Sequence, residues 1–323
     1  MIIGWDIGGT KCAVSVGERQ EGGIALLQKE VFPTKETVTP TATLARLADI
    51  TKRLCPTPEA IGISAGGPLD AGRGIILSPP NLPSWNEVRV TEYASMALGA
   101  PSYLQNDADA CALAEWKYGA GVGCDNMIFL TFGTGLGAGL ILNGRLYSGA
   151  CGMAGEVGHI RLSDYGPVGY GKAGSFEGFC SGGGIAELGK MLAKEARQSG
   201  RSLSYCQSGE SLADITAKKI AARAARGEAD AAAVFTRSAE QLGRGLSILI
   251  DLLNPERIIL GSIFVRAEAL LRPKMEEVIA RECLSLSRSA CRILPAGLGE
   301  SLGDMAALSV AAVGLENERK CIK

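Results

Sequence analysis

The amino-acid sequence predicts an α/β protein with two lobes. At 323 residues, the chain is longer than the size at which a single hydrophobic core usually stops growing. Strand-like and helix-like segments alternate through its first 120 residues, which is typical of a sheet covered by helices. One strand-turn-strand pattern occurs twice, as IIGWDIGGTKCAVSV at 2 to 16 and IFLTFGTGLGAGLIL at 128 to 142. We therefore expect each lobe to open on a glycine-rich hairpin.

The elements follow from hydrophobic patterns along the chain. Apolar runs predict strands at 2–7, 11–16, 23–32, 59–67, 102–107, 127–144 and 257–262. Amphipathic patterns predict helices at 41–54, 90–99, 108–119 and 300–314, and a strongly helical region at 182–254. We expect a small N-terminal lobe at 1–118, a large lobe at 119–300, and a C-terminal helix at about 301–323 that returns to the small lobe.

Composition and charge exclude several classes of protein. The 33 Lys and Arg residues nearly balance 34 Asp and Glu, so nothing in the charge indicates a nucleic-acid partner. No apolar run reaches 18 residues, and the N-terminus begins with a strand-like segment instead of a signal peptide. The ten cysteines are scattered without a C-x-x-C pair, as expected for reduced thiols. We expect a cytoplasmic protein with no membrane or nucleic-acid partner.

Two glycine-rich turns have the composition of phosphate-binding sites. Asp6 ends the first strand, and the turn after it contains Gly8, Gly9, Thr10 and Lys11. Gly133, Thr134 and Gly135 offer the same chemistry in the second hairpin. Backbone amides exposed by adjacent glycines bind anions, although such glycines also occur for turn geometry alone. Neither turn matches GxxxxGK[ST] or GxGxxG. The pair of turns therefore indicates ATP, with Mg²⁺ reached from Asp6 through water.

Seven motifs, taken in order, resemble a known family. They are DIGGTK at 6–11, SAGGPLD at 64–70, SPPNLPSW at 78–85, QNDADACALAE at 105–115, FGTGLGAG at 132–139, GEVGH at 155–159 and NPERIILG at 254–261. Their order is similar to that of the ROK sugar kinases, within the actin-like ATPase superfamily. The resemblance covers almost the whole chain. It implies two actin-like, ribonuclease H-like lobes of mixed sheet with flanking helices, and a ligand cleft between them.

The resemblance assigns catalysis to Asp107 as the general base. A sugar hydroxyl is too weakly acidic to attack phosphorus unaided, so a carboxylate must accept its proton. Asp107 also stands where a helix starts, and its alternative role is a helix N-cap. The resemblance further implies contacts with the sugar, in which several fixed donors and acceptors hold the hydroxyl groups. The implied sugar-binding residues are Gly67, Asn81, Asn106, Asp107, Glu156, His159 and Glu177.

One loop departs from the family pattern. Many members carry C-x-C-G-x-x-G-C-x-E there, and three thiolates with the motif histidine bind zinc. Aligned on Gly171, Gly174 and Glu177, this chain has Val168, Tyr170 and Ser175 in place of the cysteines. We expect no zinc, a loop held by packing, and a His159 that serves the sugar alone. The alternative for a lone histidine is an ordinary core or surface residue.

The remaining expectations concern the nucleotide and the activity. The resemblance places adenosine-pocket backbone at Gly261, Ser262 and the turn 297–300, although many members have a second glycine where this chain has Ser262. It implies an ATP-dependent sugar kinase and a homodimer, with the 6-hydroxyl of glucose or a related sugar as acceptor. N-acetylhexosamines, fructose, allose and β-glucosides stay open as substrates. A sugar-sensing repressor or a pseudokinase is the alternative, and Asp6 so near the start leaves no room for a helix-turn-helix domain.

Overall fold

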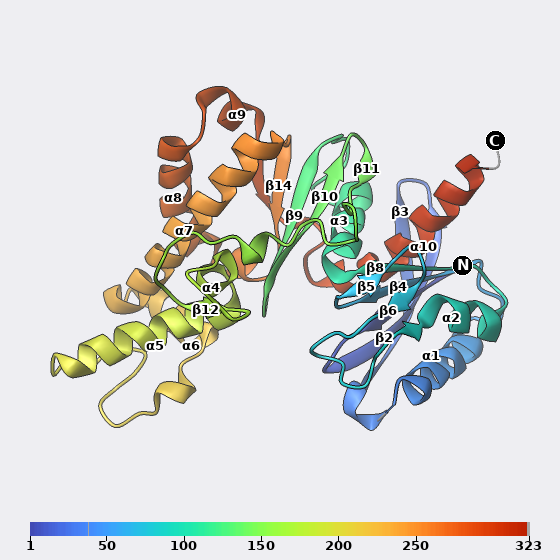
Figure 1. Cartoon of the computed structure of the whole chain (residues 1–323), viewed down its shortest axis with the longest axis horizontal. Helices are drawn as coiled ribbons and strands as arrows, with labels where there is room; N and C mark the ends of the chain where they lie inside the picture. Colours follow the sequence, from blue (N-terminus) through green and yellow to red (C-terminus); the bar gives the residue numbers. More distant parts are fainter. Residues whose placement is uncertain (38, 322–323) are drawn as a thin grey trace. The chain divides into compact units, whose positions relative to one another are not determined.

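The computed structural model of the chain describes all residues except 38, 322 and 323, so the last two residues of the predicted C-terminal helix lie outside the described part. The chain forms two compact units (Figure 1). The first consists of Met1–Asp125, Gly139–Ala154 and Gly297–Lys323, and the second of Asn126–Ala138 and Gly155–Ala296. The lobes at 1–118 and 119–300 stay a prediction. They place residues 139–154 in the second lobe, whereas Gly139–Ala154 belongs to the first compact unit.

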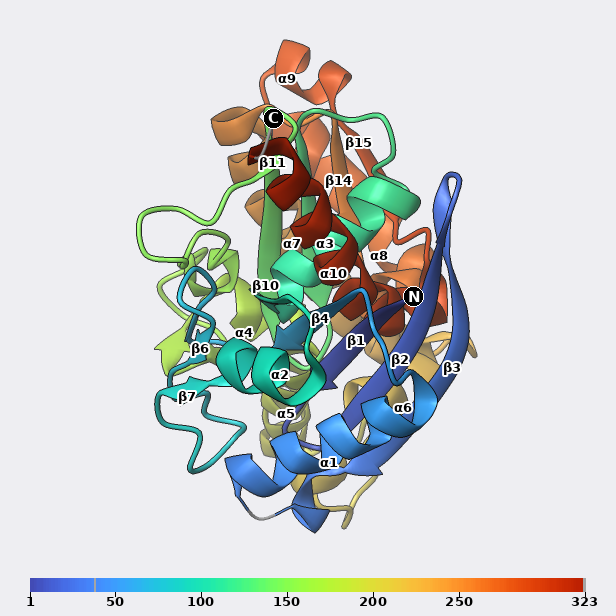
Figure 2. The same cartoon turned by 90° about the vertical axis from the view of Figure 1, so that its right-hand side faces the viewer.

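The first unit is built on a mixed sheet with the strand order β3-β2-β1-β4-β8. Strand β1 is antiparallel to β2 and parallel to β4, which is parallel to β8. The strand bounds are β1 Ile2–Ile7, β2 Lys11–Gln20, β3 Gly23–Pro33, β4 Ala60–Ala65 and β8 Ser102–Asn106. Figure 2 shows the long β2–β3 hairpin at the edge of this sheet.

Helices cover both faces of the first sheet. Alternate β1 residues Ile3, Trp5 and Ile7 pack in a core with α1 (Pro40–Leu54) and α2 (Val90–Leu98). Ile2 packs on the other face with α10 (Leu302–Cys321), beside α3 (Asp107–Tyr118). Glycine lets α10 approach closely, because a Cβ on Gly62 would lie 2.0 Å from the Ala307 carbonyl oxygen.

Short elements complete the first unit. The 3-10 helix η1 (Thr34–Glu36) follows β3, and η4 (Gly299–Ser301) precedes α10. A small antiparallel sheet has the order β5-β6-β7, with β5 at Leu69–Asp70, β6 at Ile75–Ile76 and β7 at Val88–Arg89. These short strands flank the segment 78–85, which contains the candidate residue Asn81.

The second large sheet has the strand order β11-β10-β9-β14-β15. Its strands are β9 Met127–Phe132, β10 Leu136–Leu142, β11 Arg145–Leu146, β14 Arg257–Leu260 and β15 Arg292–Pro295. β14 is parallel to both β9 and β15. β9 and β14 are buried and almost entirely apolar, as expected of central parallel strands.

The second unit is rich in helices. They are α4 Phe176–Cys180, α5 Gly182–Gln198, α6 Ala217–Ala224, α7 Ala229–Leu253, α8 Ile263–Glu282 and α9 Ser285–Ala290. Shorter pieces are η2 Val157–His159, β12 Val168–Gly169, β13 Lys172–Ala173 and η3 Leu212–Asp214. None of the helices in the described part of the chain is long and apolar enough to span a bilayer.

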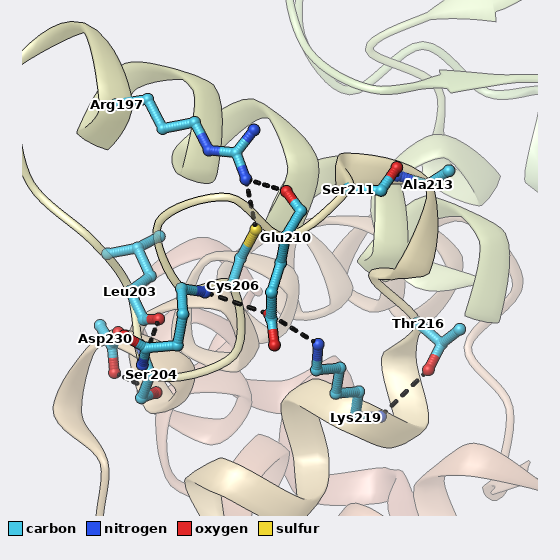
Figure 3. A network of polar contacts seen from close by, with 11 residues as sticks. Arg197, Leu203, Ser204, Cys206, Glu210, Ser211, Ala213, Thr216, Lys219 and Asp230 are labelled. Atoms are coloured by element: carbon cyan, nitrogen blue, oxygen red, sulfur yellow. Dashed lines mark hydrogen bonds and ion pairs between the residues drawn. The ribbon is translucent and has the colours of Figure 1, made fainter.

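The expected helical region 182–254 is interrupted between α5 and α6. There the chain forms a loop that polar contacts hold in place (Figure 3). Lys219 forms an ion pair with Glu210 at 3.0 Å, and the Ser204 hydroxyl donates to Asp230 at 2.6 Å. Arg197 donates to the Glu210 carbonyl. Helix α8 has no counterpart among the predicted elements, because Pro273 lies inside it and Ala267 has non-helical backbone angles.

Candidate functional site

Acidic residues collect at the carboxyl ends of the parallel strands of the first unit. Asp6 of β1 pairs with Ser64 of β4, which pairs with Gln105 of β8, so Asp107 follows at the same edge. Burial raises the pKa of Asp6 to about 6, Lys11 opposes this rise, and the carboxylates of Asp107 and Asp304 add to it. Asp107 and Asp304 thus each lie within electrostatic reach of Asp6.

Asp107 is the first residue of α3, and its neighbour Asn106 caps the helix. The Asn106 side-chain oxygen accepts from the Asp109 N–H at 2.7 Å, so the N-cap role considered for Asp107 belongs to Asn106. The Asp107 side chain opens to solvent, while the protein atoms around it raise its pKa. One of its carboxylate oxygens accepts from the Ala108 N–H at 2.8 Å, which opposes the rise. A weakly basic carboxylate becomes a better proton acceptor when its pKa rises.

The first glycine turn joins β1 to β2 beside Asp6. Gly8 N–H donates to the Lys11 carbonyl at 3.1 Å, and this bond closes the turn. The exposed Gly9 and Thr10 amides find no acceptor among the described residues. Two adjacent N–H groups of this kind can bind a phosphate.

Asn81 lies against this turn. A Cβ on Gly9 would come 2.4 Å from the Asn81 carbonyl oxygen, so only glycine fits where the 78–85 segment packs on the turn. Asn81 and Gly67 are both exposed, and a Cβ on Gly67 would approach the Leu69 backbone nitrogen no closer than 3.9 Å. The first unit thus brings the candidate residues Asp6, Gly8, Gly9, Thr10, Lys11, Asn81, Asn106 and Asp107 to one edge of its sheet.

The second glycine turn has a different support. Gly133 N–H donates to the Gly135 carbonyl at 3.1 Å, and the Gly182 N–H donates to the Gly133 carbonyl at 2.7 Å. Glu177 accepts from the Leu136 N–H at 3.0 Å, and a Cβ on Gly135 would lie 2.8 Å from its carboxylate. The sequence predicted Glu177 as a sugar ligand, and the structure adds that it buttresses the turn.

Ser262 lies next to the second turn. A Cβ on Gly133 would be 3.8 Å from the Ser262 hydroxyl oxygen, which accepts from Arg266 at 3.3 Å. Ser262 precedes α8 with a positive φ of 47°, and the buried Gly261 donates its N–H to the Leu130 carbonyl at 3.0 Å. The second unit thus brings together the candidate residues Gly133, Thr134, Gly135, Glu177, Gly261 and Ser262.

Glu156 precedes η2 and His159 is its last residue, and both are exposed on the second unit. The His159 ring meets the Tyr170 ring edge-on, with centroids 6.0 Å apart. His159 is therefore a surface residue and not a core residue. Its carbonyl accepts from the Lys172 ammonium at 2.7 Å.

Hydrogen bonds hold the loop that lacks the family cysteines. Arg161 donates to the Ala173 carbonyl at 2.7 Å, and the Gly174 N–H donates to the Pro167 carbonyl at 3.0 Å. The buried Ser175 hydroxyl caps α4 by accepting from the Gly178 N–H at 3.1 Å. Val168 and Tyr170 are exposed. Hydrogen bonds to backbone groups thus hold the loop, and the packing expected from the sequence stays a prediction.

A cation fits the first unit better than the loop. Asp6 supplies a hard carboxylate oxygen of the type that Mg²⁺ prefers, and a cation would relieve its repulsion from Asp107 and Asp304. Val168 and Tyr170 offer no soft zinc ligand. Within the described part of the chain, no group of three or more His, Cys, Asp or Glu side chains is arranged to hold a metal.

The comparison with known proteins gives the family. The ROK family model matches residues 2–313. The chain belongs to the ROK family. Among its curated relatives, a glucokinase of Thermotoga maritima is 32% identical over 86% of this chain and 87% of its own length. A glucokinase of Streptomyces coelicolor is 34% identical over 81% of each chain.

Solved structures agree with this assignment to the ROK family. The ROK family glucokinase from Streptomyces griseus, solved with glucose and AMPPNP, has a TM-score of 0.75 and 30% identity. The match covers 97% of this chain and 99% of that one. The fold is therefore the mixed α/β, actin-like fold of the ROK kinases, as the sequence predicted.

Two residues that support the candidate site, Asp304 and Glu115, were not predicted from the sequence. Asp304, at the start of α10, accepts from Ser15 at 3.1 Å and pairs with Lys29 at 2.8 Å. The fully buried Glu115 accepts from the Gly297 and Leu298 N–H groups at 3.0 and 2.9 Å. Both contacts join segments more than 180 residues apart, which no local pattern reveals. The only signal for Glu115 in the sequence is its place as the last residue of the motif QNDADACALAE.

Proposed function

We propose that this ATP-dependent sugar kinase phosphorylates the 6-hydroxyl of glucose or a close relative, with Asp107 as the general base. One observation carries the proposal. Asp107, whose pKa is raised, lies at the same sheet edge as Asp6 and a turn with two amides that have no acceptor in the described part of the chain. A proton acceptor beside a phosphate-binding turn is the arrangement that phosphoryl transfer requires.

The chemistry needs little covalent work from the protein. Asp107 accepts the proton of the sugar hydroxyl. The hydroxyl oxygen bonds to the γ-phosphorus, and the bond from that phosphorus to the ADP oxygen breaks. Asn106 uses its side-chain oxygen in the helix cap, and its amide NH₂ is the group that would orient the sugar. Bound Mg²⁺, held from Asp6 through water, would neutralise phosphate charge.

The nucleotide is proposed to bind through backbone groups of both turns. Gly9 and Thr10 offer their amides in the first unit, with Gly8 and Lys11 beside them. In the second turn, the Thr134 and Gly135 amides likewise lack an acceptor within the described residues. The adenosine is assigned to Gly261, Ser262 and the turn 297–300, in keeping with the family.

Sugar hydroxyls are assigned to polar groups from both units, and a pocket of this kind selects by unpaired hydrogen bonds. The assigned residues are Gly67, Asn81, Asn106, Asp107, Glu156, His159 and Glu177. The identity of the sugar is the open part. N-acetylhexosamines, fructose, allose and β-glucosides are the alternatives.

A coupled ADP-release assay over a panel of these sugars tests the proposal. The account predicts turnover with glucose or a close relative in the presence of ATP and Mg²⁺. If calorimetry shows that a sugar binds but no sugar in the panel causes ADP to form from ATP, the protein is instead a sugar-sensing regulator or a pseudokinase. Asp107→Asn in the same assay distinguishes slow turnover from background hydrolysis.

We further propose a cytoplasmic homodimer with no nucleic-acid or membrane partner. Ile248 and Leu252 on α7 and Leu284 and Leu286 near α9 are exposed apolar residues of the second unit. Apolar residues gathered on a surface commonly mark a subunit interface. Light scattering after size exclusion should give twice the chain mass of 33.6 kDa, and a monomer would exclude the dimer.

A further inference from the structure

We propose that Thr34 is a positioning residue for nucleotide phosphates, because it fixes the glycine turn from the side opposite to the proposed phosphate. This inference rests on the proposed function, since it deepens the role of that turn. Thr34 begins η1, directly after β3, and belongs to none of the motifs that identify the family. Nothing in its local sequence indicates a role in binding.

Thr34 holds the turn by two hydrogen bonds to carbonyl oxygens. Its hydroxyl donates to the Gly8 carbonyl at 2.6 Å, and its backbone N–H donates to the Thr10 carbonyl at 3.0 Å. A further carbonyl of the turn, that of Lys11, accepts from the Gly8 N–H at 3.1 Å. Carbonyl oxygens repel phosphate, so a turn that binds phosphate must direct them elsewhere.

The amides of the same turn are left for an anion. The Gly9 and Thr10 N–H groups are exposed and have no acceptor within the described chain. In a short turn, fixing the carbonyl of one residue also fixes the amide of the next, because both belong to one planar peptide. The Thr34 hydroxyl bond to the Gly8 carbonyl therefore orients the Gly9 N–H.

The turn needs such support because of its glycines. Gly8 and Gly9 are adjacent, and glycine loses more conformational freedom on ordering than any other residue. A turn already ordered by Thr34 loses less of that freedom when the nucleotide binds, which strengthens binding.

Thr34 is itself held in place by its surroundings. Pro33, just before it, pairs with Lys11 in the β2–β3 register, which brings Thr34 to the turn. The Cys12 thiol lies 3.4 Å from the Thr34 hydroxyl oxygen, and the Thr37 N–H donates to the Thr34 carbonyl at 3.0 Å. The position of the hydroxyl thus follows from strand register and does not depend on the nucleotide.

Thr34→Val tests the proposal, since valine keeps the shape and removes the hydroxyl. We expect the KM for ATP, and the Kd for ADP in calorimetry, to rise about 5- to 30-fold, with a change below about twofold in the sugar KM. Thr34→Ser should restore nucleotide binding to near the wild-type value. Thr43→Val is the matched control, because among the described residues the buried Thr43 hydroxyl bonds to Thr37 and Thr39, and neither bond involves the turn.

The outcomes separate this inference from the proposed function. An active wild-type kinase whose Thr34→Val variant binds ADP normally would overturn the role of Thr34 alone. Equal losses of sugar and nucleotide binding, or a Thr34→Ser variant as weak as Thr34→Val, would make Thr34 a merely structural residue. If Thr34→Val does not fold, Thr34→Ala must show the same selective loss of ADP binding, or the proposal fails. If the wild-type protein binds ADP but converts no ATP to ADP with any sugar, the proposed function is refuted. The role of Thr34 can then still be tested by measuring ADP binding.

Discussion

The two units contribute candidate-site residues with different surroundings. In the first unit, Asp6 and Asp107 are carboxylates whose pKa values protein atoms raise. In the second, Glu156 and His159 lie exposed beside η2, and Glu177 is bonded to a backbone amide. The first set is suited to accepting a proton and facing phosphate and metal. The second set offers hydrogen bonds to a ligand.

The two glycine turns show the same contrast at closer range. Thr34 holds the first turn through its carbonyl oxygens, whereas Glu177 holds the second through the Leu136 amide. Both turns keep two adjacent amides that lack an acceptor in the described residues, Gly9 with Thr10 and Thr134 with Gly135. A similar sequence pattern therefore reaches a similar arrangement of donors through unrelated supports. Removal of the Asp107 carboxylate in the first unit should therefore affect mainly the chemical step, and removal of the His159 ring in the second mainly sugar binding.

Asp107→Asn should give the largest effect. It removes the base and keeps the shape, so we expect kcat to fall by about 10² to 10⁴-fold with little change in the sugar KM. Steady-state kinetics measure both constants. Asp49→Asn, an exposed residue of α1, is the matched control and should behave as wild type. A near-normal kcat for Asp107→Asn would exclude this residue as the base.

The pH dependence of kcat/KM should show the ionisation of Asp107. A base must be ionised, and the pKa of Asp107 is raised above the ordinary aspartate value. Activity should therefore be present at neutral pH and be lost as the pH falls through a pKa higher than about 3.9. A rate profile that stays flat down to pH 4 would contradict the assignment.

Gly9→Ala should break the contact between the first turn and the Asn81 segment. Its Cβ would lie 2.4 Å from the Asn81 carbonyl oxygen, so the segment, the turn or both must move. We expect the KM values of ATP and of the sugar each to rise about 10- to 100-fold, because small displacements in a site are costly. Gly23→Ala, where a Cβ meets nothing within 4 Å, is the control. A change confined to the ATP constant would show that Asn81 does not depend on the turn.

His159→Ala should have a smaller effect that is confined to the sugar. The side chain is exposed, so we expect its loss to raise the sugar KM by an amount that corresponds to a lost hydrogen bond of about 1 to 2 kcal/mol, with kcat nearly unchanged. Kinetics at saturating ATP give both constants. Tyr165→Ala, another exposed ring from the same region, controls for surface changes. An unaltered sugar KM would make His159 an ordinary surface residue.

Chelation should have no lasting effect. The loop is held by hydrogen bonds that Arg161 and Lys172 donate and that the Ser175 hydroxyl accepts, and its sequence lacks the zinc thiolates. We expect no stoichiometric zinc by elemental analysis, and an unchanged melting temperature after a strong chelator, with activity restored by Mg²⁺. About one zinc per chain, with unfolding on its removal, would refute this account of the loop.

The sequence predicted the parts of this molecule that depend on local pattern. Strands such as β1 and β9 and the two glycine turns follow from short runs of residues, and the ROK family follows from the order of the motifs. Helix α8 was missed because Pro273 breaks its pattern. The supports of the site, Thr34 and Asp304, could not be predicted, because strand register brings Thr34 to the turn and the bond of Asp304 to Ser15 joins residues far apart in the sequence. The roles of the candidate residues stay predictions until they are measured.

The most direct test of the contrast between the units compares Asp107→Asn with His159→Ala in two measurements on each protein. Calorimetry gives the sugar Kd, and single-turnover kinetics with saturating sugar and ATP give the rate of phosphoryl transfer. We predict that Asp107→Asn keeps its sugar Kd within about threefold and loses at least about 10² in the transfer rate. His159→Ala should weaken the sugar Kd and keep the transfer rate. Normal transfer in Asp107→Asn, or a transfer rate lost in His159→Ala at saturating sugar, would contradict the division of chemistry and binding between the two units.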